Sequence, residues 1–249
     1  MNDKTAGGSA QAEYERRAAH HAADVRRRRP RILAVGAIFA VVGLLVLMVN
    51  PLWGGVVLLF DVVVVASALF ATPNSITAWQ TGAQGELRTA RLLEPLEGEG
   101  FRILHDRQIP GSRANIDHIV IGPPGIYVVE TKSLGGSLQI RDNDVFVAGR
   151  RRTKMIDEVK REALAVQIAL AKEIAARGWM VTPVICVHRA DLPWLRSEVA
   201  GVRIVSGKDL VKRLREADHL LAPADVERLA ALAAARLRPA FVAPRTPDD

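Results

Sequence analysis

Three charged residues interrupt an apolar stretch near the middle of the chain. Asp117 lies in one run of β-branched residues, and Glu130 and Lys132 lie in a second, with Gly-Pro-Pro-Gly between them. The pattern predicts strands over 116–121 and 126–131 joined by a tight turn. Because strand side chains alternate between faces, Glu130 and Lys132 point the same way. A turn centred between the two prolines sets Asp117 directly opposite Glu130.

Two carboxylates about 5 Å apart across a strand pair repel each other, and burying them together is costly. A divalent cation relieves both problems, and carboxylate oxygens suit Mg²⁺ or Mn²⁺. Lys132 could then stabilise charge on a phosphate or orient an attacking water. Mg²⁺-dependent nucleases of the restriction-endonuclease type use such an Asp followed by Glu-x-Lys on a strand. The alternative is a solvated edge hairpin in which Glu130 and Lys132 form a surface pair.

The composition narrows the class of protein. A single cysteine among 249 residues, Cys186, excludes an internal disulfide and a cysteine-rich zinc site, and its apolar surroundings predict a core position. The formal net charge is +7, and the first 31 residues hold eight basic and four acidic residues, so they carry more than half of it. The rest of the chain is only mildly basic, which gives modest support for nucleic-acid binding.

The first 72 residues alternate between basic and apolar segments. The run RRRRPR precedes about 18 uncharged residues, and Asn50-Pro51 separates them from a second apolar stretch of about 20 residues. Each stretch is long enough to cross a bilayer, so we expect a helical hairpin. Four parts follow: a flexible basic tail over 1–31 with a helical stretch over 11–25, two transmembrane helices over 32–72, a folded domain with a carboxy-terminal extension over 75–238, and a tail over 239–249.

The basic run also predicts orientation. Basic residues favour the cytoplasmic side, and two crossings return the chain to that side. We therefore expect a multi-pass protein of the plasma membrane with both termini and the folded domain in the cytoplasm. Asp61 lies within the second span, where a charge is costly. Its position suggests helix–helix contact within a homo-oligomer.

Further elements of the folded domain are predicted from periodicity. A helix over 86–96 begins with Glu86 beside its apolar stripe; the alternative for Glu86 is a first-turn residue near the helix N-terminus. A helix over 155–177 carries Gln167 at the margin of its stripe. A basic cluster at 149–154 is either a solvated turn or a phosphate-contacting edge. The other expected elements are strands over 101–106, 181–187 and 202–205, a hairpin over 137–147, and helices over 206–217 and 225–237.

The order GAQGE, then NIDHIVIGPPGIYVVETK, then a helix with Gln167 resembles the nuclease-related domain, NERD, over about residues 82–176. That family is similar to restriction-endonuclease-like nucleases. The resemblance implies an α/β fold, a mixed sheet flanked by helices. It also implies that Glu86, Asp117, Glu130 and Lys132 form the metal and catalytic set, with Gln167 as an accessory. The hydrophobic hairpin lies outside the resemblance.

Two functions remain open from the sequence. One is a membrane-anchored, Mg²⁺-dependent endonuclease or exonuclease that hydrolyses phosphodiester bonds of DNA, or alternatively RNA. In that function Glu86, Asp117 and Glu130 hold the metal, and Lys132 activates water or stabilises the transition state. The other is a non-catalytic, membrane-tethered module that keeps the nuclease fold and binds nucleic acid or a protein partner.

Overall fold

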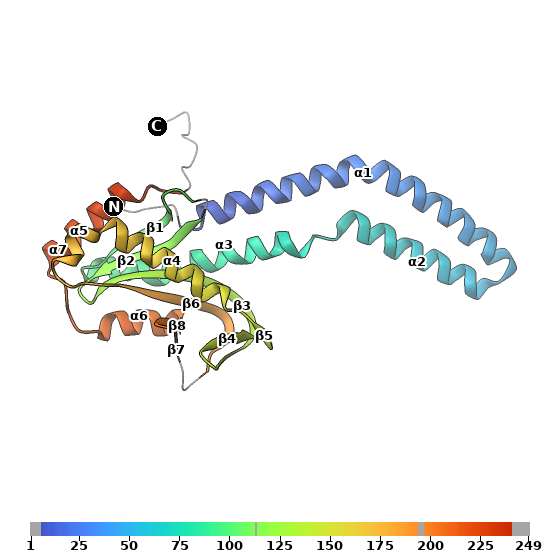
Figure 1. The fold of residues 1–249 in the computed structure, drawn as a ribbon. Helices are drawn as coiled ribbons and strands as arrows, with labels where there is room; N and C mark the ends of the chain where they lie inside the picture. Colours follow the sequence, from blue (N-terminus) through green and yellow to red (C-terminus); the bar gives the residue numbers. More distant parts are fainter. Residues whose placement is uncertain (1–5, 113, 194–196, 241–249) are drawn as a thin grey trace, which may run out of the picture. The chain divides into compact units, whose positions relative to one another are not determined.

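The computed structural model describes residues 6–112, 114–193 and 197–240, and Figure 1 shows its ribbon. The chain forms two compact units. One comprises Ala12–Gln80, and the other joins Met1–Gln11 to Thr81–Asp249. The second unit therefore combines the amino-terminal segment with everything that follows the apolar hairpin.

Two helices make up most of the smaller unit. Helix α1 spans Gly8–Val49 and α2 spans Pro51–Phe70. Asn50 ends the first helix and caps the second, because its side chain accepts hydrogen bonds from the amides of Leu52 at 3.1 Å and Trp53 at 3.2 Å. Pro51 then takes the first helical position, where its missing N–H costs nothing.

Both helices contain a segment long and apolar enough to cross a membrane. Within those segments only 11% and 6% of the residues are buried inside the protein. A core helix of a soluble domain would bury most of such a surface. The outward apolar side chains thus make these helices two candidate membrane spans.

The structure corrects the expectation of a flexible tail over 1–31. Within the described residues the chain is helical from Gly8, and the basic run lies inside α1 together with Pro30. Glu13 pairs with Arg16 and Arg17, one turn further on, at 2.6 Å and 2.5 Å. Such pairs and the many alanines favour a helix, so the segment continues into the apolar helix without a break.

The larger unit is built on an eight-stranded mixed sheet with a main strand order β1-β2-β3-β6-β8-β7. Strands β3, β6 and β8 are parallel, and the other pairs are antiparallel. This confirms the α/β class with a mixed sheet. The strands span Arg102–Gln108 (β1), Asn115–Gly122 (β2), Gly125–Arg141 (β3), Asp144–Val147 (β4), Arg150–Arg151 (β5), Val181–Asp191 (β6), Glu198–Val199 (β7) and Val202–Ser206 (β8).

The central hairpin has the predicted register. His118 pairs with Val129, and Gly122 pairs with Gly125, so Pro123 and Pro124 form a two-residue loop. Gly125 has φ +135, a backbone conformation that glycine adopts at no steric cost. The tight loop is centred where the sequence predicts it.

Strand β3 is much longer than the expected 126–131. Its pairing with β6 shifts register between Ser133 and Gly136, and Gly136 has φ +92. In the sequence, Gly135 and Gly136 resemble the end of a strand. In the structure they lie at this bulge, and the strand continues into a hairpin with β4. Asp142 and Asn143 both have positive φ at the turn, as a two-residue hairpin loop requires.

Helices cover both faces of the sheet. Apolar residues of α4 and α7 pack on one face with Ile119, Ile121 and Val128, whereas α3 and α6 pack on the other with Val120 and Val129. Figure 1 shows α4 and α6 on opposite sides of the strands. The helices are α3 Asn74–Leu93, the 3-10 helix η1 Glu94–Glu99, α4 Lys154–Ala169, α5 Ala171–Ala175, α6 Gly207–Glu216 and α7 Pro223–Arg236.

Smaller differences concern helix ends. The helix expected over 155–177 breaks at Leu170 into α4 and α5, and the helix expected over 86–96 begins earlier, at Asn74. Ser206 caps α6 by accepting from the Asp209 amide at 3.2 Å, as the capping pattern predicts. Of the tail over 239–249, Pro239 bridges to Arg107 of β1, and residues 241–249 lie outside the described residues.

Candidate active site

A row of three acidic residues crosses the edge of the sheet. The pairs His105–His118 and Arg107–Ile116 flank Asp106 and Asp117, so these two stand across from each other on β1 and β2. The register of β2 and β3 continues the row to Glu130. All three residues are buried. Register therefore explains the predicted Asp117–Glu130 pairing and adds Asp106, which the sequence analysis missed.

Backbone and lysine contacts hold the central pair in place. Asp117 Oδ2 accepts from the Thr131 amide at 2.8 Å. Lys132 Nζ donates to Glu130 Oε1 at 2.6 Å and to Glu158 Oε2 at 3.2 Å. The ammonium group of Lys132 is therefore shared between a strand and a helix, and it lies beside the predicted acidic pair as the Glu-x-Lys spacing indicates.

Helix α4 contributes two acidic residues that the sequence analysis did not single out. Glu158 binds Lys132, and Glu162, one turn later, is buried. Glu162 lies among the apolar stripe of α4, next to Val159 and Ala163. A charged residue at a buried stripe position is the signal that would have revealed it.

Gln167, the predicted accessory, lies elsewhere. Its Oε1 accepts from the Val181 amide at 2.9 Å, and its amide nitrogen contacts the sulfur of Met180 at 3.8 Å. Gln167 thus fixes the first residue of β6 through a hydrogen bond to its backbone. Five residues separate it from Glu162, which is about 140° around the helix, so the two side chains leave α4 in different directions.

Glu86 reaches the group from α3 and is buried. The preceding residue, Gly85, lets α3 approach β3 closely, because a Cβ there would lie 2.2 Å from Ser133 Oγ and 3.2 Å from the Thr131 methyl group. Among the described residues, Glu86 Oε2 and Glu162 Oε2 are buried oxygens without a hydrogen-bond partner. Buried acceptors of this kind are rare and point to a missing donor or cation.

The acidic residues raise one another's pKa values. Burial, then the charges of Glu130 and Asp106, raises the pKa of Glu86 to about 8. Burial and contact with Glu130 raise that of Glu162 to about 9. The pKa of Asp117 also lies well above its usual value, because burial and the charges of Glu130, Glu86 and Glu162 outweigh the Thr131 amide.

The pKa of Lys132 is shifted in the direction that keeps its side chain charged. Burial opposes the charge, but contact with Glu130 and the charge of Glu158 outweigh burial and raise its pKa. An ammonium group that remains protonated cannot take a proton from water. It can stabilise negative charge or donate a proton.

The donor set fits a hard divalent cation. The residues offer carboxylate oxygens, and two of these oxygens are buried without partners. Lys132, which is bound to Glu130 and Glu158, is their positive counterpart. In the described part of the chain, however, no three His, Cys, Asp or Glu side chains are already gathered around a metal position. The site is thus an acidic cluster whose side chains must converge to coordinate an ion.

Histidines occupy the opposite face of the sheet. His118 Nε2 lies 3.3 Å from Thr131 Oγ1, and His118 Nδ1 lies 2.7 Å from His105 Nδ1. Thr89 links Thr131 to His188, with oxygen–oxygen and oxygen–nitrogen distances of 2.9 Å and 2.8 Å. His118 faces away from Asp117, as strand alternation predicts. Cys186 is buried beside this network, and burial raises its pKa to about 11, so it is a core residue.

Comparison with known proteins finds a family model that matches the part of the chain that carries this cluster. Residues 81–188 match the model of the family described as "Nuclease-related domain", NERD. An uncharacterized protein of Bacillus anthracis is 31% identical over 86 residues, which cover 32% of this chain and 40% of that protein. The chain thus spans well under half the length of this relative. No solved structure matches the chain.

Proposed function

We propose that the nuclease-related domain at residues 81–188 hydrolyses phosphodiester bonds in DNA, with Mg²⁺ or Mn²⁺ as cofactor. The observation that carries the proposal is the electrostatic coupling of Glu86, Asp117, Glu130 and Glu162 in one buried cluster beside the protonated Lys132. Without a cation this arrangement raises the pKa values of its own members. A nuclease needs such a concentration of negative charge for its metal. RNA is the alternative substrate.

Each residue has a role that follows from its position. Asp117 and Glu130, held across two paired strands, would provide the rigid ligands, and Glu86 and Glu162 would complete the metal shell from two helices. A bound divalent cation would supply Lewis-acid stabilisation of the phosphate and a more acidic water. Lys132 would exchange its contact with Glu130 for the phosphate charge that develops during hydrolysis. These roles extend the predicted set by Glu162 and leave Gln167 out of it.

The two apolar helices support anchoring in the plasma membrane, with the nuclease-related domain in the cytoplasm. A homo-oligomer formed through these helices is a further part of the proposal. Asp61 lies beside α1, because a Cβ at Gly36 would be 3.6 Å from its carboxylate oxygen. A polar side chain within a span stabilises helix contacts, including those with a second copy.

A non-catalytic module is the second candidate. One observation favours it: Lys132 already neutralises Glu130 and Glu158, and no metal-binding group is preassembled among the described residues. In this alternative the cluster is a buried ion pair with protonated neighbours, and nucleic acid would bind without a divalent ion.

Cleavage of plasmid DNA by the full-length protein in detergent separates these functions. Glu130→Gln keeps the side-chain size but removes the charge, so we expect it to lose Mg²⁺ binding in calorimetry and to lose cleavage. Lys132→Ala should keep metal binding and lose about 10²–10³ in rate, the usual cost of removing one electrostatic stabiliser. Glu227→Gln is the matched control, because Glu227 pairs with Arg102 in exposed surroundings, far along the chain from the acidic cluster.

The outcome is decided by two comparisons. Equal Mg²⁺ binding by wild type and Glu130→Gln would refute the metal site. Wild-type protein that leaves DNA intact with both Mg²⁺ and Mn²⁺ would establish the non-catalytic alternative.

A further inference from the structure

Residues 137–154, here called the basic arm, extend from the strand that carries the candidate site. They comprise the end of β3, strands β4 and β5, and the first residue of α4. The arm holds five basic and two acidic residues, so its net charge is +3. The chain outside the first 31 residues has a net charge of the same size. The positive excess that follows the amino-terminal helix is therefore concentrated in the arm.

Internal contacts make the arm rigid. Asp144 is buried, and it accepts hydrogen bonds from the Val145 amide at 2.9 Å and Thr153 Oγ1 at 2.7 Å, and pairs with Arg151. At the turn, Asn143 Oδ1 accepts from the Ala200 amide at 3.2 Å. Asp144 thus neutralises one arginine and fixes the loop that carries the others.

Of the four cations of the arm other than Arg151, Arg141 donates to the side chain of Gln139, and three remain available. Arg150, Arg152 and Lys154 are exposed, and none forms an ion pair within the described residues. They lie immediately before the first turns of α4. Glu158, which contacts Lys132, follows Lys154 by four residues, or about 6 Å along the helix. Lys154 thus lies about one helical turn from a residue of the candidate site, and Arg150 and Arg152 closely precede it in the chain.

We propose that the basic arm binds the phosphate backbone of nucleic acid and directs it to the acidic cluster. This inference rests on the proposed function and deepens it. An acidic cluster repels a polyanion, so neighbouring basic side chains are needed to bind the phosphate backbone there. These basic side chains contact phosphates and do not recognise base sequence, because they are long, flexible cations at the surface of a hairpin.

Binding is measured by fluorescence anisotropy with the full-length protein in a neutral detergent and a 20-bp labelled duplex, in EDTA and at several salt concentrations. Full-length protein is needed because Ser9 belongs to the same compact unit as the domain. We expect Arg150→Ala/Arg152→Ala/Lys154→Ala to bind more weakly. The slope of log affinity against log salt should fall by about two to three, since each lost phosphate contact removes about 0.9. Arg151 is kept because it pairs with Asp144.

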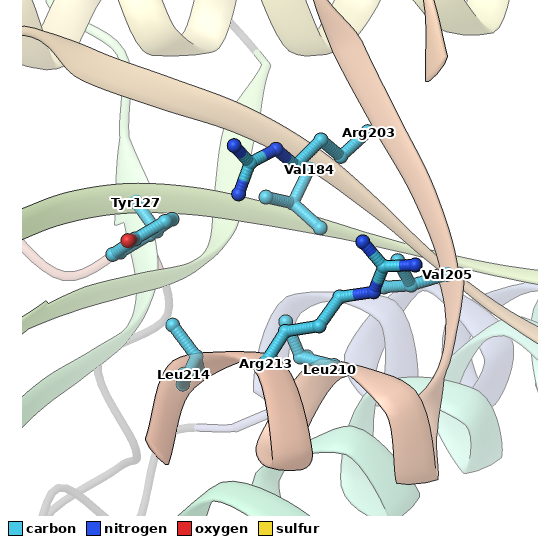
Figure 2. A pocket seen from close by; sticks show the side chains of 7 residues that line it. All are labelled: Tyr127, Val184, Arg203, Val205, Leu210, Arg213 and Leu214. Carbon is cyan, nitrogen blue, oxygen red and sulfur yellow. The ribbon is translucent and has the colours of Figure 1, made fainter. Parts of the chain in front are cut away.

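A control variant removes the same charge from the opposite face. Figure 2 shows Arg203 and Arg213 over a pocket that is also lined by Tyr127, Leu210 and Leu214. This pocket lies on the side of α6, away from α4. Arg203→Ala/Arg213→Ala/Lys208→Ala should leave the salt slope within about 0.5 of wild type. Equal losses in the two triple variants would mean that only net charge matters, and would overturn the proposal.

An anionic membrane is the other polyanionic surface to which exposed cations bind, so nanodiscs with and without anionic lipid are measured in parallel. An arm variant that loses binding to anionic nanodiscs and binds DNA as wild type does would also overturn the proposal. Binding in EDTA needs no metal. Wild type that binds through the arm and never cleaves would refute the proposed function alone, whereas cleavage with unchanged binding by the arm variant would refute this inference alone.

Discussion

Glu86 and Glu162 reach one charge cluster from different helices, and each keeps one buried oxygen without a hydrogen-bond partner among the described residues. An unsatisfied buried acceptor costs about 1–3 kcal/mol. Protonation reduces this cost, and burial and Glu130 favour it by raising both pKa values. A cation at the same oxygens would remove the cost differently, by stabilising the charged forms. A bound metal would therefore compete with protons for the same carboxylates.

This competition predicts how stability depends on pH. In the unfolded chain a glutamate ionises near 4.5, but in the folded protein Glu86 and Glu162 ionise near 8 and 9. Between these values the folded state holds more protons than the unfolded state. The stability of the metal-free protein should therefore fall as pH rises, by about 1.4 kcal/mol per pH unit for each retained proton. Mg²⁺ should reduce this fall.

Melting temperatures at pH 7, 8 and 9, in EDTA and in Mg²⁺, test this prediction. The range excludes the titration of the buried His118 and the half-buried His188, because desolvation lowers their pKa values below the usual 6.5. Glu86→Gln/Glu162→Gln should flatten the curve in EDTA. A wild-type melting temperature that stays constant or rises over this range in EDTA would contradict the assigned pKa shifts.

At the scale of elements, the closeness of α3 to β3 positions Glu86. A Cβ at Gly85 would meet Ser133 Oγ and the Thr131 methyl group, whereas a Cβ at Gly82, one turn earlier, would meet nothing within 4 Å. We therefore expect opposite effects from the same substitution. Gly82→Ala should stabilise the helix by about 0.5–1 kcal/mol. Gly85→Ala should destabilise the domain by about 1–3 kcal/mol, because α3 must move away from β3.

Urea unfolding of the two variants measures the difference, with binding of Mg²⁺ as a second readout. Gly85→Ala should also bind Mg²⁺ more weakly, because it moves Glu86 away from the other carboxylates. Stabilisation by both substitutions would show that α3 does not depend on this contact.

Elements with short-range signals were predictable from the sequence, and elements fixed by distant contacts were not. The register of Asp117 and Glu130 follows from the two-proline loop, and the structure confirms it. The length of β3 was hidden, because Gly136 resembles a strand end but forms a bulge that β6 supports. The position of Gln167 at the start of β6 was not predictable, since the margin of a helical stripe does not say which turn meets the sheet, and its accessory role stays a prediction. The metal itself stays a prediction.

At the scale of the whole molecule, the amino-terminal segment belongs to the same compact unit as the nuclease-related domain. Ser9 donates to Asp106 from its amide at 2.8 Å and from its hydroxyl at 2.6 Å. Asn115 donates to the same carboxylate at 2.7 Å. Asp106 thus caps the first turn of α1 and stands in the acidic row at the same time. The matched family model begins at residue 81, so Ser9 lies outside the matched residues and Asp106 lies within them.

This contact constrains membrane topology. The chain enters α1 from the larger unit and returns to that unit after α2. If both helices cross the bilayer, the two ends of the hairpin must therefore lie on one side. The arginine run in α1 before the apolar segment predicts the cytoplasmic side, because basic residues flanking a span are retained there. We expect a carboxy-terminal fusion to a reporter that is active only outside the cytoplasm to be silent, and a fusion at Asn50, between the spans, to be active.

Replacing Arg26, Arg27, Arg28 and Arg29 with glutamine should increase the signal of the carboxy-terminal fusion, because it removes the orientation bias. A strong signal from the carboxy-terminal fusion of the unaltered chain would contradict the cytoplasmic placement of the nuclease-related domain.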